Sequence, residues 1–346
     1  MKLNIDGSKI VALPGQTLLE LVRALDLDGV KLSERPIAAK IAGEIFNLNY
    51  VPLRVSDLCS DRPSIRRAMV ASDGNIHLIY YTDPAGKDVY ARTSQFVIFL
   101  ALQNCYPGIC AKMGGRVGPA LQIQIPDGIP FELETLKAEM KRLVALDIPL
   151  IRRRVDVDSA IARYEAAGQI DKARLLRERS VDYFDEYAYG DFSDYYYGEL
   201  APSTGYLQVW DVLPAENGFL FLYPNDNEPD EIANYVQMPH FQSVINEGNR
   251  WCALMECDAV ADLNELVRTG KIRELIRVNE ALHEKRYSQI ADMVCEQSAK
   301  VVMLSGPSSS GKTTSANRLA TQLRVHGKKP ILMSLDDYYL DRDKIA

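Results

Sequence analysis

Near its carboxyl end the chain carries the stretch Gly306-Pro307-Ser308-Ser309-Ser310-Gly311-Lys312-Thr313-Thr314, which fits the pattern G-x-x-x-x-G-K-[ST]. The apolar segment 301–305 before it predicts a buried parallel strand. Apolar residues at helical spacing after it predict a helix that ends near Gly327. Strand, loop and helix follow in the order that a phosphate-binding loop requires. The alternative is a Ser/Gly-rich surface loop that matches by chance.

The loop residues have distinct expected roles. Gly306 and Gly311 allow a tight turn in which successive N–H groups point at phosphates, next to the positive end of the helix dipole. Lys312 would bridge the β- and γ-phosphates of ATP, and the Thr313 hydroxyl would be a ligand of Mg²⁺. The pattern therefore predicts that residues 306–314 bind MgATP.

A second parallel strand is predicted at 331–335. Because a strand–helix–strand crossover is right-handed, both strands would lie in one sheet with their carboxyl ends on the phosphate side. Asp336 and Asp337 stand at that end, where an aspartate can accept the proton of a substrate hydroxyl. The alternative is a solvated turn that carries two acids.

Together with the loop, Ser334-Leu335-Asp336-Asp337-Tyr338-Tyr339 resembles the start of the uridine kinase and phosphoribulokinase family, over about residues 300–343. The resemblance implies that Asp336 is the catalytic base and that Tyr339 and Tyr338 lie by the nucleoside. The implied activity is ATP-dependent phosphoryl transfer to a nucleoside hydroxyl, with Lys312 assisting. Another small hydroxylated metabolite remains open as acceptor.

Composition is that of an ordinary soluble protein of two or three domains, with 25% charged and 47% hydrophobic residues. A net charge of −7 argues against a protein that coats nucleic acid nonspecifically, although a local basic patch stays possible. Six cysteines without a paired C-x-x-C indicate reduced thiols. With neither a signal peptide nor a membrane-spanning run in the sequence, we expect a cytoplasmic protein without membrane contact.

Residues 1–84 predict a hairpin, a helix capped by Thr17 and further short strands, which is the β-grasp order. The region resembles the TGS domain of threonyl-tRNA synthetases, some GTPases and stringent-response enzymes. The segment 39–48 carries the resemblance most clearly, whereas the stretch 57–72 is longer than that family suggests. The family implies RNA or regulatory contact, and a passive spacer is the alternative.

Residues 88–230 predict helices at 93–104, 133–146 and 158–178, followed by a cluster rich in tyrosine. Their order is similar to the second additional domain of threonyl- and alanyl-tRNA synthetases, which edits mischarged tRNA. The tyrosines can stack on bases or form a half-buried aromatic wall.

The editing site itself does not carry over. The family needs H-x-x-x-H on the first helix and C-x-x-x-H later, but Arg92 and Phe96 stand in place of the histidines, with Leu100 one turn further on. Tyr196 and Leu200 replace the later cysteine and histidine. None of these side chains can replace imidazole or thiolate as a zinc ligand.

The predicted fold class is multidomain α+β and α/β. It comprises a TGS-like β-grasp domain (1–84), an α+β synthetase-editing-like domain (88–230), a helical linker (231–299) and the start of a P-loop NTPase parallel sheet (300–346). Only two strands are predicted after Lys300, so we expect an incomplete kinase domain that is inactive alone. The alternative function is a nucleotide-switched regulatory protein that binds RNA, tRNA or the ribosome through its first 230 residues.

Overall fold

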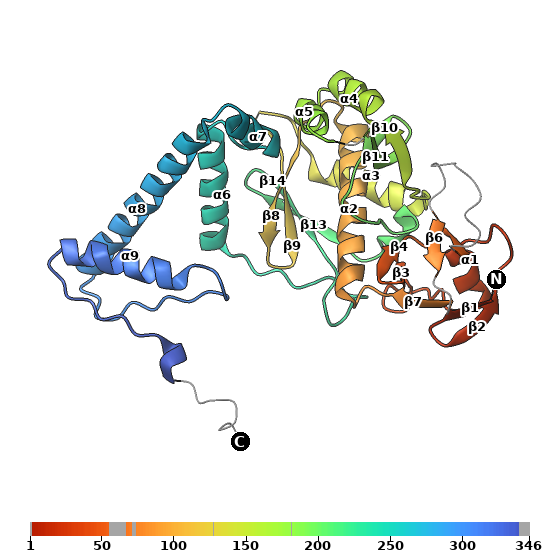
Figure 1. Ribbon diagram of the computed structural model, residues 1–346, viewed down its shortest axis with the longest axis horizontal. Coiled ribbons are helices and arrows are strands. Elements are labelled where there is room, and N and C mark those ends of the chain that lie inside the picture. The colour runs from red at the N-terminus through yellow and green to blue at the C-terminus, as the bar shows by residue number, and fades with distance from the viewer. Residues whose placement is uncertain (1, 55–66, 71–73, 127, 181, 339–346) are drawn as a thin grey trace. The chain divides into compact units, whose positions relative to one another are not determined.

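The computed structural model describes residues 2–54, 67–70, 74–126, 128–180 and 182–338. The chain divides into two compact units, Met1–Trp251 and Cys252–Ala346 (Figure 1). The architecture is mixed α+β with several separate sheets, as the sequence predicts. Within the described ranges no helix is both long and apolar enough to cross a membrane.

The first unit opens with a five-stranded sheet in the order β2-β1-β7-β3-β4. Its neighbouring strands are antiparallel, except for β1 and β7, which run parallel. Helix α1 (Leu18–Ala24) begins at a capping box, in which Thr17 and Glu20 each accept the other's backbone N–H through their side chains. The strands are β1 (Lys2–Ile5), β2 (Ser8–Val11), β3 (Ala38–Ile41), β4 (Glu44–Phe46) and β7 (Asn75–Ile79). The hairpin, helix and strands expected in this region are therefore present.

A separate parallel pair, β5 (Val51–Arg54) and β6 (Arg67–Val70), was not expected from the sequence. The remainder of the long stretch 57–72 lies outside the described residues.

A four-stranded antiparallel sheet in the order β13-β14-β9-β8 and the long helix α2 form the next part of the unit. Helix α2 (Pro84–Cys105) begins earlier than the predicted Thr93, because Pro84 favours a first helical position. Its middle is wholly buried at Phe96, Val97 and Ile98. The other elements are β8 (Lys112–Val117), β9 (Ala120–Gln124), α3 (Leu133–Ala145), η2 (Thr204–Tyr206), β13 (Asp211–Ala215) and β14 (Gly218–Leu222).

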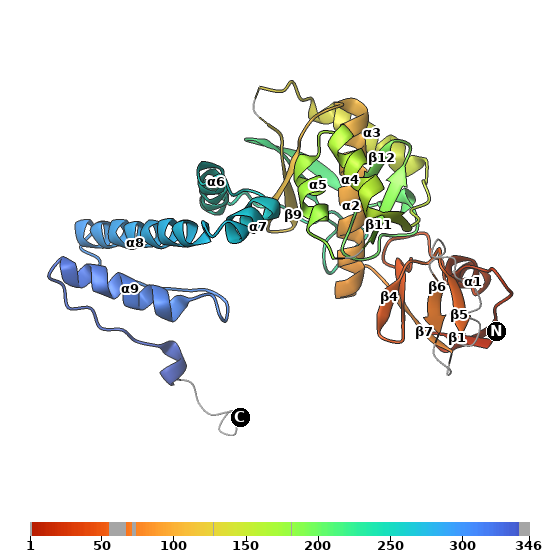
Figure 2. The same ribbon diagram turned by 45° about the horizontal axis from the view of Figure 1, so that its top comes forward.

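The third part is a three-stranded antiparallel sheet with two short helices (Figure 2). Its strands are β10 (Arg153–Asp156), β11 (Tyr183–Tyr189) and β12 (Phe192–Asp194), and its helices are α4 (Val157–Ala166) and α5 (Ile170–Arg177). The sequence predicts one helix over 158–178. Instead the chain breaks at Gly168, whose φ of 71° is the left-handed conformation that ends helices.

Buried amides join the five-stranded sheet to the rest of the unit. Asn47 is fully buried, and its Nδ2 donates to the carbonyls of Leu200 at 2.8 Å and Ala201 at 3.2 Å. Asn49 Nδ2 donates to the carbonyl of Pro202 at 2.7 Å. The loop that follows β4 is therefore fixed to residues 200–202, which come much later in the chain.

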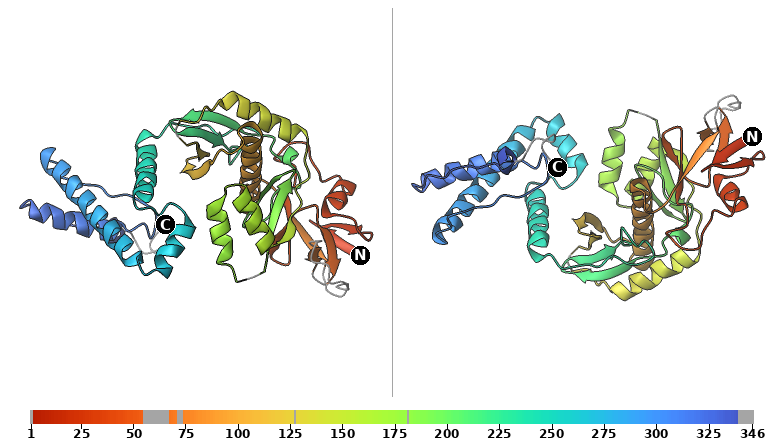
Figure 3. Two further views of the ribbon diagram at one scale, coloured as in Figure 1. Left: turned by 90° about the horizontal axis from the view of Figure 1, so that it is seen from above. Right: turned by 90° about the horizontal axis from the view of Figure 1, so that it is seen from below.

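Three helices make up most of the second unit: α7 (Val260–Arg268), α8 (Ile272–Glu296) and α9 (Lys312–Val325). Helix α6 (Pro239–Leu254) leads into it, so residues 231–299 are mainly helical as predicted. Helices α8 and α9 lie side by side in every view (Figure 3). An ion pair between Arg318 and Glu284 at 2.8 Å and a hydrogen bond between the hydroxyls of Tyr287 and Ser315 at 3.0 Å link them.

The parallel sheet predicted for this unit is not confirmed. Residues 301–305 and 331–335 form no strand in the described chain, and the second segment ends in the short turn η3 (Leu335–Tyr338). Met303 is 90% exposed and Ile331 86% exposed, so neither side chain is covered by a sheet. A strand gains its stability by pairing its backbone groups with a neighbour, and neither segment has one here.

We expect Asn47→Ala to destabilise the first unit by about 1–3 kcal/mol, because the carbonyls of Leu200 and Ala201 would lose a buried donor. Urea denaturation of the whole chain, followed by the fluorescence of Trp210, measures the change. Asn104→Ala is the matched control, since that amide donates to Glu139 at the surface. Equal shifts for the two variants would contradict the proposed role of the buried amide.

Candidate functional site

The loop 306–314 turns tightly and leads into α9. Gly311 and Ser309 have φ angles of 79° and 60°, and a Cβ on Gly306 would lie 2.8 Å from Ser310 Oγ. Ser315 N donates to Gly311 O at 2.9 Å, which is the first bond of the helix. The N–H groups of Lys312, Thr313 and Thr314 lie before this bond and therefore have no acceptor within the helix. They are available to bind an anion.

Lys312 lies back over this loop. Its Nζ donates to the carbonyls of Gly306 at 2.9 Å and Pro307 at 2.7 Å. The ammonium group is thus held on the loop by neutral acceptors, which a phosphate group can replace with a stronger, charge-assisted bond.

The loop and the predicted site residues Asp336 and Tyr338 belong to different elements. Thr313 and Thr314 are exposed at the start of α9, whereas Asp336 is exposed in η3 and Tyr338 is 70% exposed. Within the described part of the chain, no hydrogen bond or ion pair joins Asp336 to the loop. Tyr339 lies outside the described residues.

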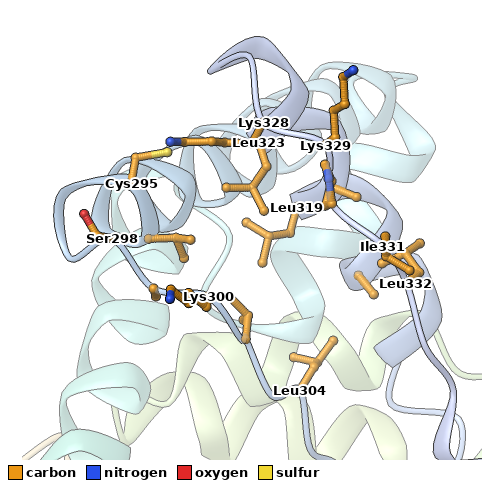
Figure 4. A pocket seen from close by; sticks show the side chains of 16 residues that line it. Cys295, Ser298, Lys300, Leu304, Leu319, Leu323, Lys328, Lys329, Ile331 and Leu332 are labelled. Atoms are coloured by element: carbon orange, nitrogen blue, oxygen red, sulfur yellow. The ribbon is translucent and has the colours of Figure 1, made fainter.

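A pocket of about 470 Å³ lies on another side of α9 (Figure 4). Leucine and other apolar side chains line it, including Leu304, Leu319 and Leu323, together with Lys300 and Lys328. None of the residues 306–314 belongs to its lining. It is therefore distinct from the candidate nucleotide loop.

The four positions that stand for the lost editing ligands come together in the first unit. The rings of Phe96 and Tyr196 lie 6.4 Å apart, and Arg92 Nε donates to the carbonyl of Glu199 at 2.9 Å. Phe96 and Leu200 are fully buried. Phe192 closes the space further, with its ring centre 5.2 Å from that of Phe96. Packed rings therefore occupy this place instead of a metal-binding cavity.

A buried carboxylate, Glu199, lies next to these rings. Tyr50 and Tyr187 donate their hydroxyls to its Oε2 at 2.9 and 2.8 Å, and Arg152 donates to its Oε1 at 2.8 Å. Burial, followed by the charge of Glu199, raises the pKa of Tyr187, which stays a neutral donor. Tyr50 follows the first sheet and Tyr187 belongs to β11, so one carboxylate connects separate parts of the unit. Sequence analysis missed Glu199 and Asn47, although an acid within Tyr-Tyr-Gly-Glu-Leu was an available signal.

Two tyrosine contacts lie on the three-stranded sheet and the segment after it: Tyr183 with Arg154 on one face, and Tyr195 with Tyr197 beside Phe184 of the other face. We call Arg154, Tyr183, Tyr195 and Tyr197 the tyrosine end. There β11 begins at Tyr183, and the antiparallel β12 runs out toward Tyr195 and Tyr197. Arg154 lies over the Tyr183 ring at 3.9 Å, and Tyr197 is 81% exposed with its ring edge-on to Tyr195 at 5.8 Å.

The charge state of the tyrosine end is fixed at neutral pH. Burial, with a further contribution from Tyr197, raises the pKa of Tyr195 to about 12. The ring therefore stays neutral, while Arg154 carries the positive charge and pairs with Asp185 at 3.3 Å. Exposed aromatic faces, one of them beside a cation, are suited to stacking with nucleic-acid bases.

No protein-family model matches the chain. The chain is similar to the threonine–tRNA ligase of Carboxydothermus hydrogenoformans, at 27% identity over 57% of this chain and 28% of that protein. It matches the Desulforamulus reducens threonine–tRNA ligase at 27% identity over 59% of this chain and 29% of that protein. The Symbiobacterium thermophilum threonine–tRNA ligase is 26% identical over 62% of this chain and 30% of that protein.

These matches locate the similarity mainly in the first unit. An alignment that covers 57% of the chain cannot fit within Cys252–Ala346, so more than half of it lies in Met1–Trp251. The chain spans less than a third of the length of these relatives. The similarity supports the expected likeness of the first unit to a threonyl-tRNA synthetase editing domain.

The predicted nucleoside kinase is contradicted by these comparisons. The matched relatives are ligases that act on tRNA by name, and a nucleoside acceptor has no support. The structure gives the physical reason, since among the described residues neither predicted strand of the kinase sheet forms and Asp336 makes no hydrogen bond or ion pair with the loop. A match to G-x-x-x-x-G-K-[ST] alone did not establish the activity.

We expect Glu199→Gln to lower the free energy of unfolding by about 3 kcal/mol, because Arg152 loses a buried countercharge and one amide oxygen replaces the two oxygens that accept from Arg152 and the tyrosines. The midpoint of urea unfolding measures it. Glu165→Gln, which removes the charge of an exposed ion pair with Arg177, is the control and should cost under about 1 kcal/mol. A Glu199 variant as stable as the control would show that the buried pair contributes nothing.

Proposed function

We propose that the chain is a tRNA-binding protein whose RNA affinity depends on a nucleotide bound at residues 306–314. The observation that carries the RNA-binding proposal is the tyrosine end, where the exposed ring of Tyr183 lies against Arg154 and the ring of Tyr197 is 81% exposed. The similarity to tRNA ligases supports tRNA as the RNA concerned.

Unpaired bases are the expected partners of the tyrosine end. Tyr183 is 45% exposed and Tyr197 is 81% exposed, so each can offer a ring face to a base. Base stacking on an aromatic side chain contributes about 1–3 kcal/mol per base. Bases are accessible in the single-stranded ends and loops of an RNA, whereas those within a helix are stacked on each other. The end or a loop of tRNA is therefore the segment we expect here.

Local charge, and not overall charge, would attract the RNA. The whole chain has a net charge of −7, which repels polyanions at long range. Arg153 and Arg154 begin β10, and their side chains are 50% and 33% exposed. Both guanidinium groups already form ion pairs, Arg153 with Glu186 and Arg154 with Asp185. Few cations are thus offered to phosphates, and we expect a weak salt dependence and a large share of binding from stacking.

The nucleotide proposal rests on the loop. Its N–H groups, the left-handed Gly311 and the ammonium of Lys312 are the groups that hold phosphates in G-x-x-x-x-G-K-[ST] loops. Mg²⁺ would neutralise phosphate charge and fits the exposed Thr313 hydroxyl, while the phosphates supply its other oxygen ligands. On binding, Lys312 would leave the carbonyls of Gly306 and Pro307 for a phosphate oxygen.

A nucleotide acts as a switch only if it binds the RNA-bound and RNA-free chains with different affinity. Coupling between two sites is reciprocal and typically amounts to about 1–3 kcal/mol. The test is the affinity for deacylated tRNA with and without saturating MgATP. Equal affinities would reject the switch and leave RNA binding and nucleotide binding as separate properties.

We expect Tyr197→Ala to weaken tRNA binding about fivefold to a hundredfold, because the exposed ring is lost as a stacking surface. Fluorescence anisotropy with labelled tRNA at fixed salt measures the dissociation constant. Tyr197→Phe keeps the ring and should bind like the natural chain, and Arg142→Ala controls for loss of an exposed cation elsewhere. The stacking proposal fails if the Phe and Ala variants bind equally.

We expect Lys312→Ala to weaken binding of a fluorescent ATP analogue about tenfold or more, because a charge-assisted bond to phosphate is lost. Lys329→Ala is the matched control, since that lysine borders the pocket of Figure 4 and not the loop. If both variants bind the analogue as the natural chain does, residues 306–314 are not a phosphate site.

A further inference from the structure

The end of helix α6 brings two cysteines together. Cys257 N donates to Cys252 O at 3.0 Å and Glu256 N donates to Ala253 O at 3.1 Å, while Glu256 has a φ of 51°. These are the two hydrogen bonds and the left-handed residue of a Schellman motif. In that motif the side chains at the positions of Cys252 and Cys257 commonly touch each other.

The distance between these residues is suited to a disulfide. Standard bond lengths and the 3.0 Å hydrogen bond keep the Cα atoms of Cys252 and Cys257 within about 7 Å. Disulfides need Cα atoms about 4.4–6.8 Å apart. Both thiols are free, with Cys252 exposed and Cys257 half-buried. Burial, then the charge of Asp262 and then that of the Cys252 thiolate, raise the pKa of Cys257.

We propose that Cys252 and Cys257 form a reversible disulfide when the chain meets a low-molecular-weight disulfide such as oxidised glutathione. The thiolate of the exposed Cys252 attacks one glutathione sulfur, which breaks the glutathione S–S bond and releases one reduced glutathione. The Cys257 thiolate then attacks Cys252 Sγ and releases the second. The two cysteines are oxidised, the glutathione disulfide is reduced, and the protons given up by the two thiols are taken up, through solvent, by the two released glutathione thiolates.

The chain contains its own control for this reaction. Cys105 and Cys110 are separated by the same number of residues as Cys252 and Cys257. Their sulfurs face different partners, Thr135 O for Cys105 at 4.0 Å and Gly108 O for Cys110 at 3.9 Å. In the described backbone no hydrogen bond joins this second pair. The two pairs have the same separation in sequence but different geometry. A difference in how readily they oxidise therefore measures the effect of the turn after α6.

The experiment is a titration of the whole chain with mixtures of oxidised and reduced glutathione, followed by acid quenching, tryptic digestion and mass spectrometry. Both cysteines of each pair fall in one peptide, 251–268 for the proposed pair and 93–112 for the control pair. We expect peptide 251–268 to lose two hydrogen atoms at a ratio of oxidised to reduced glutathione at least about tenfold lower than peptide 93–112 requires. In urea this preference should disappear, because the turn is lost.

Two variants complete the test. Cys257→Ser should trap Cys252 as a glutathione adduct, because no second thiol resolves it, and Cys252→Ser should remove the loss of hydrogen from the peptide. The proposal is overturned if the natural chain carries glutathione adducts on peptide 251–268 without forming the disulfide between Cys252 and Cys257. It is equally overturned if the two peptides oxidise together, or if urea leaves the preference unchanged.

Discussion

The first unit depends on one buried carboxylate. Glu199 receives hydrogen bonds from Tyr50, Tyr187 and Arg152, and the amide of Asn47 meets the carbonyls that follow it. Partners from distant parts of the sequence must all be in place before this charge can be buried at low cost. The five-stranded sheet, helix α2 and strand β11 are therefore held in one arrangement, and the tyrosine end is presented on a fixed support.

The first unit is similar to an editing domain, and packed side chains fill the place where the ligands of that family are expected. Arg92, Phe96, Tyr196 and Leu200, which the sequence analysis places at the histidine and cysteine positions of that family, pack or bond to backbone. A closed aromatic interior leaves no room for a hydrolytic site. Any contact with RNA must then be made at the surface, and the exposed rings of Tyr183 and Tyr197 are suited to that role.

Local patterns predicted local structure well and long-range assembly poorly. Thr17 identified the start of α1, and the loop 306–314 leads into α9 as its motif requires. Residues 301–305 and 331–335 have the composition of strands, but a strand also needs a neighbour, which composition cannot supply. Glu199 and Asn47 escaped notice because their importance comes from partners about a hundred residues or more away. For the same reason Asp336 was assigned a role that its position in η3 does not support.

The most direct test of the account is crosslinking of the whole chain to tRNA that carries 4-thiouridine, followed by mass spectrometry of the crosslinked peptides. The account predicts crosslinks in the peptides that contain Tyr183 and Tyr197, with fewer when unlabelled tRNA competes. Crosslinks confined to Cys252–Ala346, or none above those of a protein that does not bind RNA, would contradict it.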